Sequence, residues 1–183
     1  MLRLAAFLLS FAPLSARAAE GIDDLARFSA PENWAVERDT VSADPKSRWT
    51  FGRHVLTVKL FGGPGSEYET PAAFLDGFGA RTMGAPAVRI GTATAAGAPL
   101  YEYRYPVELG DPHAASPVPP VLARAEVCLI PAGKRFFAVS YAYEAIIPDP
   151  RLNGQGFWRD FLKGFKLKKT QTPRRAGTPE KRP

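Results

Sequence analysis

The sequence has 183 residues, of which 45% are hydrophobic and 23% charged, and its formal net charge is +6. This composition is typical of a globular protein, and the length fits one domain with its own hydrophobic core. The positive charge is concentrated at one end, because residues 163–183 hold eight basic side chains and one acidic, whereas residues 19–162 hold 14 basic and 17 acidic. This distribution argues against a nucleic-acid-binding domain.

The first 18 residues have the pattern of a secretory signal peptide. A cationic start at Arg3 precedes an apolar run over residues 4–14, and a small-x-small cleavage pattern follows at residues 16–18. The apolar run is too short to span a bilayer. We therefore expect bacterial export, removal of residues 1–18, and a periplasmic or secreted protein. No later segment has the length and apolarity of a membrane span.

The middle of the chain alternates short strand patterns with turns rich in glycine and proline. Residues 21–29 predict a short helix or arm, and residues 44–47 predict a turn. Residues 62–66 break the strand pattern, and residues 131–134 form a plausible hairpin turn. Strands are predicted where polar and apolar residues alternate, over residues 34–41, 48–51, 54–61, 87–94, 100–109, 121–130 and 135–144.

Two helices are predicted. The first has Thr70 as its N-cap and Pro71 at its first helical position, where the missing N–H of proline costs nothing. Its apolar stripe is Phe74, Leu75, Phe78 and Met83. The second helix follows Pro150 and carries a broad stripe at three- and four-residue spacing, made of Phe157, Trp158, Phe161, Leu162 and Phe165. Such a stripe must be buried against the sheet.

These elements predict an α+β fold, in which helices pack on an antiparallel sheet of six to seven strands. Residues 19–167 are expected to form a single domain, held together by its core because Cys128 is the only cysteine. Residues 168–183 are expected to be a disordered basic tail. Such a tail either keeps the protein solvated or makes weak contact with an anionic surface.

The order of several aromatic motifs resembles a known family. Phe28, Pro31 and Trp34 open the strand region, and a helix follows YETP (68–71). GKRFFAVSYAYE (133–144) resumes the strands, and FWRDFLKGFK (157–166) closes the region. In this order the motifs resemble the Mog1/PsbP-like superfamily, including DcrB-like bacterial envelope proteins, over about residues 28–166. The resemblance implies an α/β/α sandwich and an accessory or binding role, and it assigns no ligand residue to this sequence.

Few residues could supply catalytic or metal chemistry. His54 and His113 are the only histidines, and no H-x-x-x-H or C-x-x-C pattern occurs. Cys128 lies among apolar residues of a predicted strand, where a buried thiol is expected. The glycines of residues 62–65 are not followed by the Lys-Ser/Thr of a phosphate-binding loop. We therefore predict a protein that is not an enzyme, with no catalytic, metal-binding or cofactor-binding residues.

The candidate ligand or partner face is a set of charged residues on the predicted sheet. Strand alternation places Glu102 with Arg104 on one side of a strand and Arg124 with Glu126 on one side of the next, while Lys59 takes a comparable position in an earlier strand. On the opposite side of the first strand lie Tyr101, Tyr103 and Tyr105. Two interpretations stay open: a cross-strand ladder of opposite charges, or a polar cleft for a ligand or partner.

The leading functional hypothesis is an exported, non-catalytic accessory protein that binds a protein partner or envelope component. The alternative is a small-molecule carrier or enzyme that uses the charged face. A deep cavity of several hundred Å³ lined by the four strand residues would favour a small ligand. A face that is shallow or covered by the closing helix would favour a partner. The long, proline-rich segment 106–120 fits either a functional loop or a plain surface loop.

Overall fold

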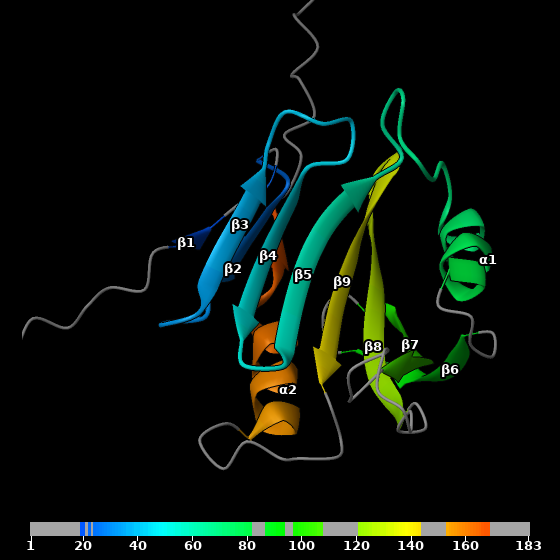
Figure 1. The fold of residues 1–183 in the computed structure, drawn as a ribbon. Helices are drawn as coiled ribbons and strands as arrows, with labels where there is room; N and C mark the ends of the chain where they lie inside the picture. The colour runs from blue at the N-terminus through cyan, green and yellow to red at the C-terminus, as the bar shows by residue number, and fades with distance from the viewer. Residues whose placement is uncertain are drawn as a thin grey trace, which may run out of the picture.

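The computed structural model describes residues 19–20, 22, 24–81, 87–93, 97–107, 121–143 and 153–168. Within these residues the helices are α1 (Pro71–Arg81) and α2 (Gly154–Gly164) (Figure 1). The strands are β1 (Ala19–Glu20), β2 (Ala26–Ser29), β3 (Ala35–Asp39), β4 (Lys46–Phe51), β5 (His54–Phe61), β6 (Val88–Thr92), β7 (Pro99–Val107), β8 (Val121–Ala132), β9 (Arg135–Tyr143) and β10 (Lys166–Leu167).

Seven strands form one antiparallel sheet in the order β3-β4-β5-β9-β8-β7-β6. The hairpin between β8 and β9 turns at Gly133, whose positive φ of 71° suits glycine. Strand β9 inserts between β8 and β5, so segments about 80 residues apart pair at the centre of the sheet. A small second sheet joins β2 with β1 and β10. The predicted α+β fold with an antiparallel sheet of seven strands is confirmed.

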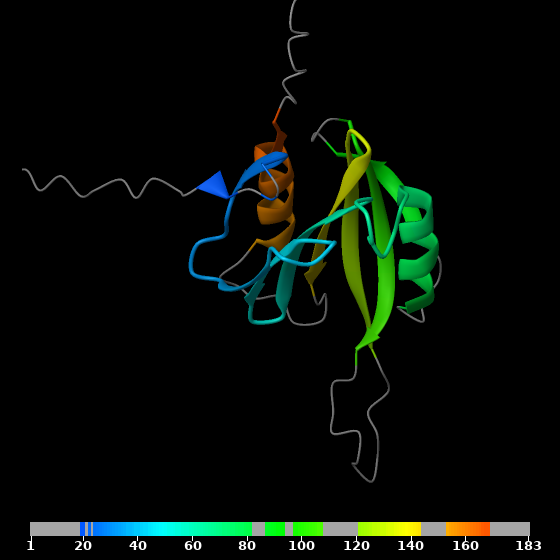
Figure 2. The ribbon, with the colours of Figure 1, turned by 90° about the horizontal axis from the view of Figure 1, so that it is seen from above.

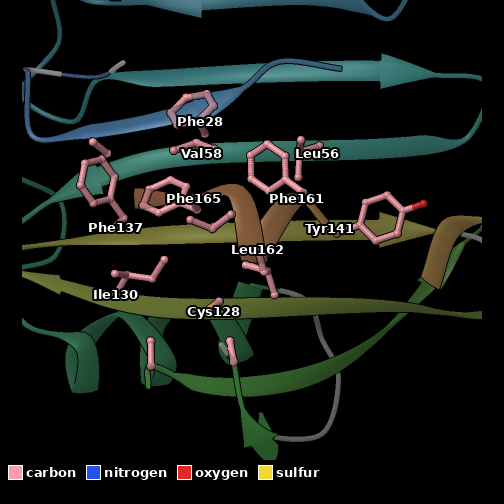
Figure 3. Close-up of a cluster of buried hydrophobic side chains, with 14 of the residues drawn as sticks. Phe28, Leu56, Val58, Cys128, Ile130, Phe137, Tyr141, Phe161, Leu162 and Phe165 are labelled. Atoms are coloured by element: carbon pink, nitrogen blue, oxygen red, sulfur yellow. The ribbon is translucent and has the colours of Figure 1, made fainter. Parts of the chain in front are cut away.

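Helix α2 covers one face of the sheet together with β2. The helix begins after Asn153, whose side chain accepts a hydrogen bond from the Gly156 N–H at 3.0 Å. Its predicted apolar stripe is confirmed, since Trp158 and Phe161 are buried there. Phe28 of β2 packs between this helix and the sheet, with its ring stacked 5.5 Å from that of Phe165 (Figure 3).

Helix α1 covers the opposite face (Figure 2). The Thr70 hydroxyl accepts a hydrogen bond from the Ala73 N–H at 3.2 Å, which confirms the predicted N-cap. Phe74 packs against Phe61 and Phe136, with ring centroids 5.3 and 6.2 Å away. The centre of the sheet is therefore buried on both sides. The Phe78 side chain and Met83, also predicted for this stripe, lie outside the described residues.

Two local predictions at the N-terminal side are corrected. Residues 26–29 form a strand and not a helix, because Ala26 and Phe28 are buried while the residues after them are exposed. This is period-two alternation, which a strand satisfies and a helix does not. The turn predicted at residues 44–47 lies at residues 41–44, and β4 already begins at Lys46.

Lys168, which the sequence assigns to the tail, contacts residues 24 and 25. The Lys168 N–H donates to the Leu25 carbonyl at 2.8 Å, and its ammonium group pairs with Asp24 at 2.5 Å. This ion pair holds the pKa of the Asp24 carboxyl below its usual value. Residues 1–18 and 169–183, which include the predicted signal peptide and most of the tail, lie outside the described residues.

Two helix glycines should respond in opposite ways to alanine. A Cβ at Gly77 in α1 would lie 2.5 Å from a ring carbon of Tyr68, whereas a Cβ at Gly164 in α2 would meet nothing within 4 Å. Alanine favours a helix by about 0.5–1 kcal/mol over glycine, and overpacking costs about 1–3 kcal/mol. We expect urea denaturation to show a small gain in stability for Gly164→Ala and a loss for Gly77→Ala. Equal stability of the two variants would contradict the Tyr68 contact.

Candidate functional site

The four charged residues predicted on neighbouring strands meet on the face that α2 covers. The β7–β8 register places Glu102 opposite Glu126 and Arg104 opposite Arg124, so like charges face each other directly. Attraction therefore runs along one diagonal, between Arg124 and Glu102, and along each strand between residues two apart. The Arg124 Nη2 group contacts Glu102 and lies 3.7 Å from Glu126, while the Arg104 Nε group donates to Glu102 at 3.2 Å. The result is one network centred on Arg124.

Lys59 does not belong to this network. Strand β5 pairs with β9, where Lys59 is opposite Ala138, and Ala138 is in turn opposite Leu129 of β8. These two residues belong to the cluster under α1, so Lys59 projects from the other face. There its ammonium group lies 4.6 Å from the centre of the Phe61 ring and 3.5 Å from Glu67. Alternation within a strand shows which of its residues share a side. The pairing of β5 with β9 is what places Lys59 on the face that α1 covers.

Tyr101 and Tyr103 of β7 lie on the side opposite the charged residues, as predicted, and this side is the one that α1 covers. Tyr103 is buried in the cluster under α1, and Tyr101 packs against the same cluster. Burial raises the pKa of the Tyr103 hydroxyl, because the phenolate would lose its hydration. The side chain of Tyr105 lies outside the described residues. The two faces of β7 therefore differ sharply, one aromatic and buried, the other charged.

Glu126 links the charged network to α2. Its carboxylate accepts a hydrogen bond from the Trp158 indole N–H at 2.9 Å, and both residues are almost fully buried, at 4% and 1% exposed. The Trp158 ring also stacks on Tyr141, with centroids 5.7 Å apart. A buried carboxylate needs such partners, because an unpaired one is very costly. Helix α2 thus covers Glu126, the most buried residue of the charged network.

Beside α2 a groove of about 580 Å³ stays open over β6, β7 and β8. Apolar groups come from both sides of the groove, with Ile90 and Leu100 on the strands and Trp158 and Leu162 on the helix. The β6–β7 register shifts between Arg89 and Gly91, a bulge at the position of Ile90. The volume is within the range of known ligand-binding sites.

The charges along the groove are mostly positive. Arg124, Arg159 and Lys163 line it together with one acid, Glu126, whose charge is already engaged by Trp158 and Arg124. Lys163 lies 3.1 Å from Asp160 in an exposed pair, which contributes little. The Nε atom of Arg124 is buried and has no hydrogen-bond partner within the described residues. The groove therefore favours an anionic group.

The sequence reasoning found part of this site and missed the rest. Arg124 and Glu126 line the groove. Glu102 contacts Arg124 from outside the groove, and Arg104 contacts Glu102. Arg159 and Lys163 were not among the predicted site residues. Their four-residue spacing on the flank of an amphipathic helix was the available signal.

Cys128 and His54 do not form a nucleophilic pair. Cys128 is fully buried, and burial raises the pKa of its thiol to about 12. Through Val139, Cys128 aligns with Val58 of β5, which lies four residues and therefore roughly 13 Å from His54. The His54 Nδ1 atom is instead 2.8 Å from the Tyr141 hydroxyl. Among the described residues, no group of three or more His, Cys, Asp or Glu could hold a metal ion. His113 lies outside them.

A scan against protein-family models, a search of curated proteins and a search of solved structures each found no match for this chain. Within the described part, no helix has the length and apolarity needed to cross a membrane. The function of the groove must therefore be inferred from its own residues.

Replacing Arg124 should destabilise the protein, because Arg124 offsets the repulsion between the Glu102 and Glu126 carboxylates. We expect Arg124→Met to lower the free energy of unfolding by about 2–3 kcal/mol near pH 7, because Glu102 and Glu126 then face each other. Arg104→Met is the control. Its side chain is 67% exposed, so the expected loss is below about 1 kcal/mol. An equal loss for Arg124→Met and Arg104→Met would contradict this account.

The Cys128 thiol should be inert in the folded protein. With a pKa of about 12, only about one thiol in ten thousand is ionised near pH 8, and the side chain is also inaccessible. We expect no reaction with Ellman's reagent over hours in buffer and one equivalent released in denaturant. Rapid labelling of the native protein would show that the thiol is accessible and would reopen a nucleophilic role.

Proposed function

We propose that this protein is an exported, non-catalytic accessory protein that binds a protein partner through the groove beside α2. The observation that carries the proposal is the combination of apolar side chains with a row of cations in one open groove. Ile90 and Leu100 offer apolar surface there, and Arg159 and Lys163 lie on the opposite side, on α2. Exposed apolar side chains beside arginine are typical of protein-binding surfaces. Export rests on the signal-like pattern of residues 1–18.

The state of the two carboxylates supports binding over catalysis. Glu102 is held by two arginines, and Glu126 is held by Trp158 and Arg124. A general base needs a free lone pair within reach of a substrate proton. Carboxylates already occupied by cations and an indole N–H suit a structural role better. The buried thiol of Cys128 is equally unsuited to nucleophilic attack.

The shape of the charged face also supports a partner. Only Arg124 and Glu126 of the four strand residues line the groove, and α2 covers the buried Glu126 carboxylate. A groove open along the flank of a helix suits a segment of another chain. Its volume of about 580 Å³ favours a small-molecule carrier as the second candidate.

We also propose membership of the Mog1/PsbP-like superfamily. The support is an antiparallel sheet with α1 and α2 on opposite faces, the α/β/α arrangement that the resemblance implies. Helix α1 directly follows residues 68–70, and α2 closes the described domain, which is the element order on which the resemblance rests. The accessory role implied by the resemblance agrees with the groove.

Site-specific photo-crosslinking in the native envelope tests the proposed function. Lys163 at the groove is replaced by p-benzoyl-phenylalanine, and in the control Arg89 is replaced, an exposed residue of β6 that shares the α1 side with Tyr101. We expect irradiation to produce a discrete protein adduct from position 163 and none from position 89. The same adducts from both positions, or none from position 163, would contradict a protein partner in the groove.

A further inference from the structure

The flank of α2 that lines the groove carries polar residues at a fixed interval. Gln155, Arg159 and Lys163 follow each other at four-residue spacing, and all three line the groove. An α-helix rises 1.5 Å per residue, so neighbouring members of the row lie about 6 Å apart along the axis. The row ends in two exposed cations, Arg159 and Lys163.

An extended peptide matches this interval. Side chains on one side of an extended chain recur every second residue, or about 6.6–6.8 Å. Two acidic residues separated by one other residue would therefore reach Arg159 and Lys163 together. The intervening side chains would point the other way, toward the strand side of the groove. That side offers Ile90 and Leu100, and Ile90 is a large apolar residue with 41% of its surface exposed.

We propose that the occupant of the groove is an extended segment of the partner protein in which acidic and apolar residues alternate. Its acidic side chains pair with Arg159 and Lys163, and its apolar side chains pack on Ile90 and Leu100. The inference rests on the proposed function and adds the sequence pattern that the groove selects.

Two labelled peptides of the same composition test the spacing. SEVEVEVES places glutamates at alternate positions, whereas SEEVVVEES places them adjacent or at least four apart, which includes the helical spacing. Fluorescence anisotropy with the full folded domain should show the alternating peptide binding at least tenfold more tightly. Equal affinity for the two peptides would mean that only net charge is sensed and would overturn the proposal. So would the absence of binding by either peptide.

Paired charge reversals locate the binding. Arg159→Glu with Lys163→Glu should weaken the alternating peptide at least tenfold. The matched control, Arg89→Glu with Lys134→Glu, changes the net charge equally at exposed residues outside the groove and should leave affinity within about twofold. Circular dichroism verifies that both double variants are folded. Equal loss in both variants would overturn the proposal.

Two further outcomes separate this inference from the proposed function. A cross-link from position 163 with no peptide binding would retain the partner and reject the alternating acidic segment. Peptide binding without a cross-link would support the selectivity of the groove and reject the proposed partner in the envelope. Binding of phosphatidylglycerol vesicles that requires Arg159 and Lys163, with neither peptide binding, would overturn the inference in favour of a membrane surface.

Discussion

The hydrogen bond between the Trp158 indole and the Glu126 carboxylate fixes the position of α2 on the sheet. An aromatic stripe alone tolerates sliding, because apolar contacts are not directional. A buried carboxylate does not tolerate such sliding, because a shift of α2 by one turn would leave Glu126 without the Trp158 indole N–H as its donor. The groove exists because α2 is held at this place, above β8 and beside β6 and β7. One polar contact in an apolar interface therefore positions the candidate binding surface.

The cross-strand register explains why the charges on the strands pair with one another, whereas Arg159 and Lys163 on α2 stay exposed to the groove. Glu102 faces Glu126 directly, and Arg124 must bridge them to keep both charges in place. The strand charges thus satisfy one another. Arg159 and Lys163 are exposed on α2, outside this bridge, and they give the groove its excess positive charge. The network stabilises the site, and the helix provides the cations available to a ligand.

The sequence predicted those features that depend only on residues close together in the chain. The stripe around Trp158, the Thr70 cap and the alternation in β5 and β9 each depend on neighbouring residues, and the structure has all of them. Pairing over long sequence separations was not predictable in this way. The side on which Lys59 projects depends on the insertion of β9, and β2 is a strand because residues 166–167 pair with it. The sequence did not predict Arg159 and Lys163 as site residues, because their role depends on the strands that lie across the groove from them.

The two edge strands of the large sheet, β3 and β6, are poorly suited to pairing with a strand of a partner. Unpaired edge strands normally invite a further strand, and proteins protect them with bulges and charges. Strand β6 has a bulge between Arg89 and Gly91, and the short edge strand β3 carries Glu37 and Arg38. Both edges are thus poor templates for strand addition. A segment in the groove would be held by its side chains and not by a ladder of backbone hydrogen bonds. Its side-chain sequence would then determine which partner binds.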